Sequence, residues 1–314
     1  MLILCQNISM IPKNLITNAA KEVGFDRVGL VPAMPFGEES RRFGEWLSGG
    51  YHSTLSYLER NVEKRFDASK LVDGARSVVV CGVAYLSEYS RGYPEGWRTK
   101  IASYALNRDY HITIKEMLTA MAERLKMYSP QLRFRAFTDS APLAEKSYAR
   151  RAGLGWIGRN SLLVTPEYGS MLLLGELVMD DTVDEYDSPK EYVGCGECRR
   201  CVEACPNGAI SENRYIDTRR CIACRTIEPM ADGEGIGLDG WIFGCDACQT
   251  VCPYNQRARL HTNPHFDPVI NPLSLDSAAW LAMSEEEFSV IASSTPLTRA
   301  GLERIRAKVK QSEK

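Results

Sequence analysis

Hydrophobic residues in roughly the first 180 residues alternate between helical and strand-like spacing. Between Leu15 and Val23 they recur at every fourth position, and the pattern ends at Gly24, which predicts a helix that stops there. The next segment, residues 27–33 (RVGLVPA), has the composition of a strand. Residues 77–86 (SVVVCGVAYL) form a nearly continuous apolar run, as expected of a strand that is buried on both faces.

A longer helix is predicted to begin just after Asp109, Tyr110 and His111. Its inner stripe consists of Ile114, Met117, Leu118, Met121 and Leu125. Residues 171–180 (MLLLGELVMD) are a further predicted strand. This alternation of helices and strands indicates a mixed α/β (α+β) domain.

The acidic stretch DDTVDEYDSP, residues 180–189, separates this pattern from a cysteine-rich region and marks a domain boundary. We expect a first domain over residues 1–184 and a second, cysteine-containing domain over residues 185–262. The C-terminal part, residues 263–314, reads as Asn- and Pro-rich loops that lead into a short helical tail.

Basic residues dominate the tail from Thr298 to Lys314, with only Glu303 and Glu313 against them. They are Arg299, Arg304, Arg306, Lys308, Lys310 and Lys314. A solvated face of a terminal helix is the simpler explanation of such a run. A surface that contacts phosphate groups is the alternative.

The composition excludes some classes of protein. With 314 residues, 44% of them hydrophobic, the chain is long enough for one substantial core and a smaller domain. No segment approaches the ~20 uncharged apolar residues of a membrane span. The N-terminus lacks the basic and apolar regions of an export signal, so we expect a cytoplasmic protein with reduced thiols. The formal net charge of −2 argues against general attraction to nucleic acid, although local basic surfaces are compatible with it.

Nine of the eleven cysteines lie between Cys195 and Cys252. In CGECRRCVEACP, spacings of two, two and three residues precede a proline, which is the bacterial ferredoxin pattern. In that pattern the fourth cysteine ligates the other of two clusters. The cysteines of this run are Cys195, Cys198, Cys201 and Cys205.

A second run, CDACQTVCP, repeats the ending of the first with Cys245, Cys248 and Cys252. It lacks a leading cysteine, and the nearby suppliers are Cys221 and Cys224. The spacing therefore predicts two iron-sulfur clusters that exchange one ligand, with either Cys221 or Cys224 as the eighth.

Zinc and disulfides are the competing explanations of these cysteines. Two CxxC pairs would make a four-thiolate zinc site, but zinc explains neither the CP endings nor eight thiolates. Disulfides do not suit a chain without an export signal. The remaining two cysteines, Cys5 and Cys81, are predicted to be small buried side chains.

Three segments are similar to nucleotide- or cobalamin-binding motifs but do not meet the requirements of those motifs. Gly153, Gly155 and Gly158 match GxGxxG, but they follow a helical stretch rather than a strand, so we expect a helix cap and a turn. A phosphate-binding loop requires Lys-Ser/Thr where Arg159-Asn160 stands. The segment beginning at Asp109 starts like the DxHxxG signature of histidine-ligated cobalamin, but position 114 is Ile.

Several segments together resemble the epoxyqueuosine reductase family. They are TDSAPLAEKSYARRAGLGWIGRNSLLVTPEYGSMLLLGELVMD, ASYALNRDYH, YLERNVEKRFD and the two cysteine runs, within a resemblance from about residue 10 to about residue 308. That family uses cobalamin and two 4Fe-4S clusters to reduce the epoxide of epoxyqueuosine in tRNA to the alkene of queuosine. The resemblance implies a cobalamin-binding α/β domain, a two-cluster ferredoxin-like domain and a short helical C-terminal tail.

The resemblance also implies two partners. One is tRNA that bears epoxyqueuosine in the anticodon loop, and the other is an external electron donor similar to flavodoxin or ferredoxin. Longer members continue into a helical-repeat domain that helps to hold tRNA, and the sequence stops before it. We therefore expect tRNA binding to be weaker and to depend strongly on salt.

Asp139, in TDSAP, matches the family's catalytic proton donor. Opening an epoxide creates an alkoxide that a nearby acid must protonate, so the residue type suits the role. A helix N-cap is the alternative, because Asp139-Ser140-Ala141-Pro142 reads as a helix start, where Ser140 is a second candidate for the cap. An apolar corrin face would raise the pKa of Asp139 by desolvation.

Other assignments follow from the same resemblance. Asp109, Tyr110 and His111 match an element that faces the active site, which implies substrate contacts or support of the catalytic group; a structural histidine at a helix start is the alternative. Segments that line cobalamin in the family contain Arg60, Ser103, Asn160, Leu163 and Ser170, and the resemblance implies that Asp139 also lies against the cofactor.

The family pattern also divides the cysteine ligands. It implies one cluster on Cys195, Cys198, Cys201 and Cys252, and another on Cys205, Cys221, Cys245 and Cys248. Cys221 is thereby preferred over Cys224, which departs from the pattern. Two rival functions are a cobalamin-dependent reductase of another substrate, such as a reductive dehalogenase, and a plain iron-sulfur electron carrier.

Overall fold

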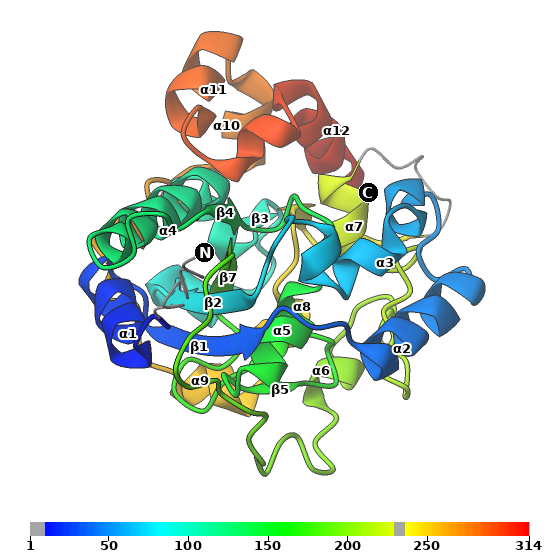
Figure 1. The fold of residues 1–314 in the computed structure, drawn as a ribbon. Coiled ribbons are helices and arrows are strands. Elements are labelled where there is room, and N and C mark those ends of the chain that lie inside the picture. The colour runs from blue at the N-terminus through cyan, green and yellow to red at the C-terminus, as the bar shows by residue number, and fades with distance from the viewer. Residues whose placement is uncertain (1–9, 229–235, 314) are drawn as a thin grey trace, which may run out of the picture.

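A four-stranded antiparallel sheet forms the centre of the N-terminal half of the chain (Figure 1). The computed structural model describes residues 10–228 and 236–313. In spatial order the strands are β1 (Arg27–Pro32), β2 (Ser77–Ala84), β7 (Leu172–Met179) and β4 (Phe134–Phe137). All eight residues of β2 are buried, which confirms the prediction of a strand covered on both faces.

Helices cover the two faces of this sheet. α1 (Lys13–Glu22) and α4 (Tyr110–Lys126) pack on one face, where Val79, Cys81 and Leu177 join a common core. α5 (Glu145–Arg151) packs on the other face, over Val80 and Val178. The short α3 (Val62–Arg65) and the longer α2 (Gly37–Ser48) continue this second layer. The alternation of residues along the strands thus divides the sheet into two separate cores.

The predicted helical stripe is confirmed, but the start of its helix was misplaced. All five inner residues of the stripe are buried in α4. The helix begins at Tyr110, not after His111, because the Asp109 carboxylate accepts the backbone N–H of His111 and caps the first turn. A side chain at Gly175 would collide with Ile114 and Leu118, so a glycine in β7 permits this close packing of α4.

The GxGxxG segment turns the chain, as predicted. Gly153 follows the end of α5 with a φ of +69°, and a side chain there would come within 2.7 Å of the Ser188 carbonyl oxygen. The segment continues into a short hairpin of β5 (Trp156–Ile157) and β6 (Leu163–Val164). No dinucleotide fingerprint is formed, because the glycines follow a helix.

The cysteine-rich region consists of short helices and one strand. These elements are α6 (Arg200–Glu203), α7 (Ile222–Ile227), β8 (Trp241–Phe243), α8 (Ala247–Thr250) and α9 (Pro253–Arg257). β8 pairs in parallel with β3 (Lys100–Ile101), which comes from the N-terminal half. The two predicted domains therefore share a small sheet.

The C-terminal segment packs as part of the folded body. Its helices are α10 (Ser277–Ala282), α11 (Glu285–Ala292) and α12 (Leu302–Ser312), which form the lobe at the top of Figure 1. Trp280 is fully buried in a core that also contains Ile101 and Phe243. The segment is thus a helical lobe that is anchored on both predicted domains.

Several basic residues of this lobe are held in hydrogen bonds or buried within the folded structure. Arg304 donates to the carbonyl oxygens of Ile227 and Glu228. Arg306 binds Glu303 and the Met283 carbonyl, and Lys308 is only 8% exposed. For these three side chains a freely solvated face is therefore wrong, and contact with phosphate groups stays a prediction.

The acidic stretch at the predicted first boundary is fixed to the N-terminal half. Lys13 forms ion pairs with Glu185 and Asp187 at 2.8 and 2.7 Å, and Val183 is buried in the core beneath α1. The acidic stretch is therefore part of the N-terminal half, and the chain continues into the cysteine-rich region only after it. The three domain limits themselves stay a prediction.

Within the part of the chain that the structure describes, no helix combines the length and the apolar character required to cross a bilayer.

The buried position of Trp280 makes a stability prediction. Trp280→Ala should lower the free energy of unfolding by about 3–5 kcal/mol, because the large cavity would separate the C-terminal lobe from β3 and β8. Val290→Ala on the same lobe, at a side chain that is 83% exposed, should change it by less than about 0.5 kcal/mol. Urea unfolding followed by circular dichroism measures both, and equal effects would contradict an anchored lobe.

Candidate active site

The site forms where the start of α4 meets the loop that follows β4. The cap at Asp109 places Tyr110 and His111 on the first turn of α4. β4 ends at Phe137, and two residues later Asp139 adopts a left-handed conformation with a φ of +55°. Such a backbone is uncommon outside glycine, asparagine and aspartate, and it is often found at functional sites.

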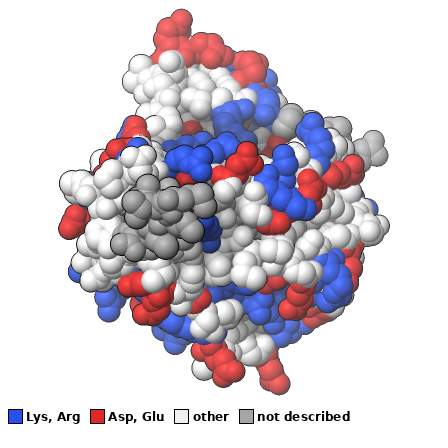
Figure 2. All heavy atoms as spheres, in the orientation of Figure 1, with Lys and Arg blue, Asp and Glu red and all other residues white. Residues whose placement is uncertain are grey.

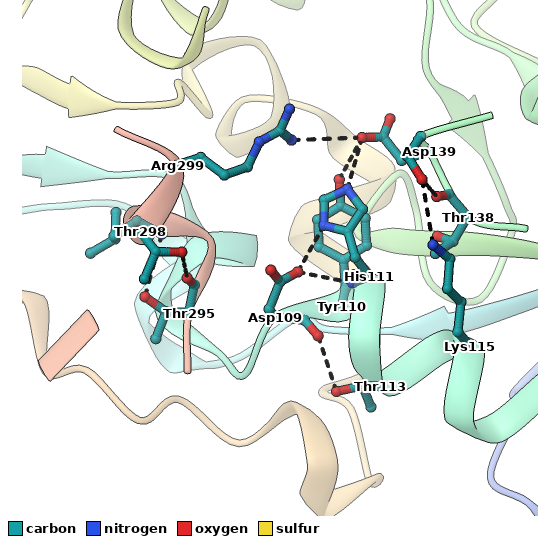
Figure 3. Close-up of polar contacts among 12 residues, drawn as sticks. Asp109, Tyr110, His111, Thr113, Lys115, Thr138, Asp139, Thr295, Thr298 and Arg299 are labelled. Carbon is teal, nitrogen blue, oxygen red and sulfur yellow. Dashed lines mark hydrogen bonds and ion pairs between the residues drawn. The ribbon is translucent and has the colours of Figure 1, made fainter. Parts of the chain in front are cut away.

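His111 lies between two carboxylates (Figure 3). Its Nδ1 is 2.7 Å from Asp109 Oδ1, and its Nε2 is 3.1 Å from Asp139 Oδ2. The Tyr110 hydroxyl donates to the same Asp139 oxygen at 3.1 Å, and the Tyr110 and His111 rings stack. The three residues assigned to the active-site face are therefore brought together with Asp139.

The electrostatics of this group favour a proton on His111. Burial alone lowers the pKa of His111, but the hydrogen bonds and charges of Asp109 and Asp139 outweigh it and raise the pKa to about 9. Burial raises the pKa of Asp139, yet His111, Tyr110 and Arg299 together lower it below its ordinary value. Near neutral pH the pair is therefore an imidazolium and a carboxylate.

Asp139 is neither buried nor part of a helix. Its side chain is 51% exposed, and Arg299 of the C-terminal lobe approaches its Oδ2 to 4.0 Å. α5 begins only at Glu145, with Ala144 at its N-cap, so the alternative that Asp139 or Ser140 caps a helix is wrong. The side chain is instead directed at the His111–Tyr110 pair (Figure 3).

A large open cavity adjoins Asp139. It has a volume of about 1120 Å³ and extends between α2, α3, α5 and the first cysteine run. Its wall includes Asp139 and Tyr57 at one part and Cys195 at another. The cavity therefore connects the candidate acid with the first candidate cluster ligand.

The wall of this cavity offers unused hydrogen-bond donors. Trp156 Nε1 and Arg65 Nε are buried and have no partner among the described residues, and both residues line the cavity. Buried donors normally have partners, so these N–H groups suit a ligand with amide oxygens at its edge. The apolar rings of Phe43 and Trp46 line the same wall. A corrin, which is apolar on its faces and carries amides around its rim, fits such a wall.

The individually assigned cobalamin positions lie elsewhere. Asn160 lines a small cavity with the first cysteines, Leu163 is buried in the core under α5, and Arg60 is exposed after η1 (Ser56–Glu59). Neither these three nor Ser103 and Ser170 belong to the wall of the large cavity; of the assigned positions, Asp139 does. As contacts of the cofactor they stay predictions.

Ser103 and Ser170 belong to a buried network that connects the N-terminal half to the second cysteine run. The Ser103 backbone N–H and hydroxyl both donate to Asp246 Oδ2 at 2.7 Å. Asp246 also accepts from Gln249, whose amide oxygen accepts the Ser170 hydroxyl. Asn255 completes the network through Ser170. These bonds fix the backbone between Cys245 and Cys248.

The first group of candidate cluster ligands converges in space. A cavity of about 50 Å³ is lined by Cys195, Cys198, Cys201 and Cys252, together with Arg159 and Asn160. Burial raises the pKa of Cys201, and so do the charges of the other three cysteines. This is the set in which one ligand comes from the opposite run.

Cys221 and Cys224, the two candidates for the second group, differ in the charged groups around them. Burial raises the pKa of Cys245, and the charges of Cys221 and Cys205 add to it. For Cys224 burial comes first, followed by the charges of Cys221 and Glu228. Cys221 thus interacts electrostatically with Cys205, Cys245 and Cys248, and Cys224 interacts with Cys221 and Glu228; the choice of Cys221 as the eighth ligand stays a prediction. Among residues 10–228 and 236–313 no three ligand side chains converge closely enough to hold a single metal ion, whereas a cluster spaces its thiolates around four irons.

Three parts of the site were not identified from the sequence. Arg299 comes from a tail that was considered only for phosphate contacts, and Asp246 is a polar residue within a cysteine run. Glu176 is fully buried in β7, and its one signal is a charged residue in an otherwise apolar strand. Cys81 is buried as predicted, and Cys5 lies outside the described residues.

The chain is similar to known proteins over most of its length. Residues 65–140 match the family model described as "Epoxyqueuosine reductase QueG, DUF1730", and residues 194–255 match "4Fe-4S double cluster binding domain". An epoxyqueuosine reductase of Cyclobacterium marinum is 37% identical over 288 residues, which cover 91% of this chain and 91% of that protein.

Solved structures give the same result. A crystal structure of epoxyqueuosine reductase with an epoxyqueuosine-modified tRNA-Tyr stem loop is 29% identical, with a TM-score of 0.83 over 96% of this chain and 80% of that one. The Bacillus subtilis enzyme, described with its catalytic aspartate loop swung out of the active site, is also 29% identical, with a TM-score of 0.84 and the same coverage.

A reductive dehalogenase shares the fold more distantly. Its TM-score is 0.51 at 15% identity, over 98% of this chain and 37% of that one. At this level of identity the likeness concerns the fold alone.

The separation of the two candidate cysteines predicts different consequences of their replacement. Cys221→Ser should lose about half of the bound iron, because one cluster would lack a thiolate ligand. Cys224→Ser, the matched control, should keep the iron content of the unaltered protein. Iron and sulfide analysis after anaerobic reconstitution measures both variants, and the opposite pattern would reverse the assignment.

Proposed function

This chain belongs to the epoxyqueuosine reductase family, and we propose that it reduces the epoxide of epoxyqueuosine in tRNA to the alkene of queuosine. The observation that carries the proposal is the contact of His111 Nε2 with Asp139 Oδ2, where Asp139 lines a cavity that reaches Cys195. A candidate proton donor and a candidate cluster ligand therefore line the same cavity, which has space for a large cofactor.

The reaction consumes two electrons and two protons. Both carbon–oxygen bonds of the epoxide are broken, a carbon–carbon double bond forms, and the oxygen leaves as water. We propose that an external donor, similar to flavodoxin or ferredoxin, supplies the electrons one at a time through the two clusters. The chain itself must supply protons where the oxygen departs.

Cobalamin in the large cavity would supply a strongly reducing cobalt centre for the epoxide. The residues best placed to hold it are those of the cavity wall, with Trp156 and Arg65 as donors to its amides. Phe43 and Trp46 would cover apolar surface. Cofactor contacts are also predicted at five residues outside this wall. To reach them, the cofactor would have to extend beyond the wall; they are Arg60, Ser103, Asn160, Leu163 and Ser170.

Asp139 and His111 would act as one acid. The proton resides on His111 Nε2, which faces Asp139 Oδ2, and Asp139 is the more exposed partner at the cavity. When substrate excludes water from Asp139, desolvation raises its pKa and favours transfer of the proton from His111. Asp139 then donates one proton to the departing oxygen, while Asp109 keeps His111 oriented, and the second proton of the water comes from solvent, directly or after the pair has been reprotonated.

We propose that the two clusters use the ligands grouped above. Cys195, Cys198, Cys201 and Cys252 would hold the first, which borders the cavity through Cys195. Cys205, Cys221, Cys245 and Cys248 would hold the second. Electrons would then pass from the second cluster to the first and on to the cavity.

A tRNA substrate would approach between the main body and the C-terminal lobe. On the face shown in Figure 2, lysine and arginine side chains gather below this lobe, mixed with acidic ones. Arg299 extends from the lobe to Asp139, so a phosphate near the modified base would have a cation available. A tRNA substrate also places the proposed reaction in the cytoplasm.

Replacement of the candidate acid tests the proposal. Asp139→Asn should lower turnover of an epoxyqueuosine-containing stem loop by about 100- to 10,000-fold, since an amide cannot transfer the proton. The variant should still bind cobalamin and assemble both clusters, which absorption spectra report. Asp73→Asn, at an exposed aspartate, is the matched control. Full turnover by Asp139→Asn would remove Asp139 from the mechanism.

The proton on His111 predicts an alkaline limit of activity. Because the pKa of His111 is raised from 6.5 to about 9, its ion pairs are present at neutral pH and are lost as pH rises through about 9, and the stability that they contribute is fully present below pH 6.5. Turnover should therefore fall above pH 9. The groups that face the imidazole are Asp109, Tyr110 and Asp139, and Arg299 acts on it through Asp139.

His111→Gln should reduce turnover roughly 10- to 100-fold and abolish this alkaline limb, because the amide stays neutral at every pH. A pH profile of turnover, with circular dichroism to verify the fold, measures both effects. Unchanged turnover of the unaltered protein above pH 9 would contradict a stored proton on His111.

A further inference from the structure

A second ionisable group lies behind the active site, within the core between the sheet and α5. Glu176 occupies the middle of β7 and is 0% exposed. Leu174 and Val178, two residues away on either side, join the core under α5, so Glu176 faces the same way. Among the described residues its carboxyl oxygens form no hydrogen bond of good geometry, and the neighbouring Glu145 carboxyl group interacts with Glu176 through its charge and as a side-chain hydrogen-bond partner. An unpaired carboxylate is costly in such a place, so the group must be neutral.

Glu145, at the start of α5, lies between Glu176 and the cavity. It lines the cavity wall, and its charge interacts with that of Glu176. Burial first, and then the charge of Asp139, raise the pKa of Glu145 to about 7. Burial and the charge of Glu145 raise the pKa of Glu176 well above its usual range. Two carboxyl groups in one apolar site cannot both ionise, so the pair holds a proton, and it belongs to Glu176.

Glu145 also contacts the catalytic loop directly. Its Oε1 accepts the backbone N–H of Asp139, the residue with the left-handed φ of +55°. The loop between them is held at its other end, where the Ala144 N–H donates to the Arg65 carbonyl oxygen. The neighbouring Lys146 turns to the Ser161 carbonyl. Glu145 thus binds the backbone N–H of Asp139, while His111 binds its side-chain carboxylate.

We propose that Glu145 is a positioning residue that holds the backbone of Asp139 in its left-handed conformation, and that Glu176 stays neutral so that Glu145 remains an acceptor. The inference rests on the proposed function for its effect on turnover, but the hydrogen bond itself can be measured without turnover. A charged acceptor gives the stronger bond, so the arrangement should be tightest when Glu145 is ionised.

Three variants test this role. Glu145→Ala removes the acceptor and should lower kcat roughly 10- to 100-fold with little change in KM, because substrate contacts stay intact. Glu145→Gln keeps an acceptor oxygen and should recover most of the lost kcat. Glu176→Gln keeps a neutral group in the core and should retain kcat within roughly threefold at neutral pH. Glu285→Ala, at an exposed glutamate in the first turn of α11, controls for the loss of a helix N-terminal charge.

Hydrogen exchange provides the readout that does not depend on activity. In Glu145→Ala the amide of Asp139 should exchange faster than in the unaltered protein, while the amides of β4 should keep their protection. The pH profile adds a second criterion: below pH 7, as Glu145 gains a proton, kcat of the unaltered protein should fall only to about the level of Glu145→Gln, and Glu145→Gln should lack this limb. The groups that face Glu145 are Asp139, Glu176 and Lys146.

The inference is overturned if Glu145→Ala keeps both its kcat and the exchange rate at Asp139. It is also overturned if Glu145→Gln loses as much kcat as Glu145→Ala, or if Glu176→Gln does. Faster exchange in Glu145→Ala, in a protein whose unaltered form never converts the substrate, would uphold the positioning role and reject the proposed function.

Discussion

The imidazolium of His111, held between Asp109 and Asp139, is the interaction on which the active site depends. It requires the N-terminus of α4, where Asp109 serves at once as helix cap and as partner of the ring. It also requires β4 to end beside that helix, which the packing of α4 over Gly175 permits. Without the two carboxylates the ring would be neutral near pH 7, and Asp139 would have no adjacent proton to transfer.

The residues proposed to supply protons and those proposed to carry electrons come from different parts of the chain and meet at one cavity. His111 and Glu145 lie on helices that pack on the central sheet, and Asp139 lies in the loop that follows β4. The cysteine runs are fixed to that body by the Ser103–Asp246 bonds and by the pairing of β3 with β8. Because Cys195 and Asp139 line the same wall, electrons and protons can reach a substrate from different directions.

The sequence predicted the parts whose chemistry is local. Cysteine spacing indicated two clusters, and apolar periodicity located β2 and α4, because both signals arise within a few residues. The place of Asp139 was misread as a helix start, since only the fold shows that α5 begins six residues later. The choice of Cys221 depended on family resemblance. Long-range contacts such as Arg299 with Asp139, or Glu145 with Glu176, have no local pattern and could not be predicted.

Turnover of an epoxyqueuosine-bearing anticodon stem loop by the reconstituted protein tests the account most directly. Mass spectrometry of the modified nucleoside would follow the reaction under anaerobic conditions, with a chemical reductant and with or without cobalamin. The account predicts loss of one oxygen atom from the nucleoside only when cobalamin is present. An unchanged nucleoside in the presence of protein that retains cobalamin and both reducible clusters would contradict it, as would equal conversion without cobalamin.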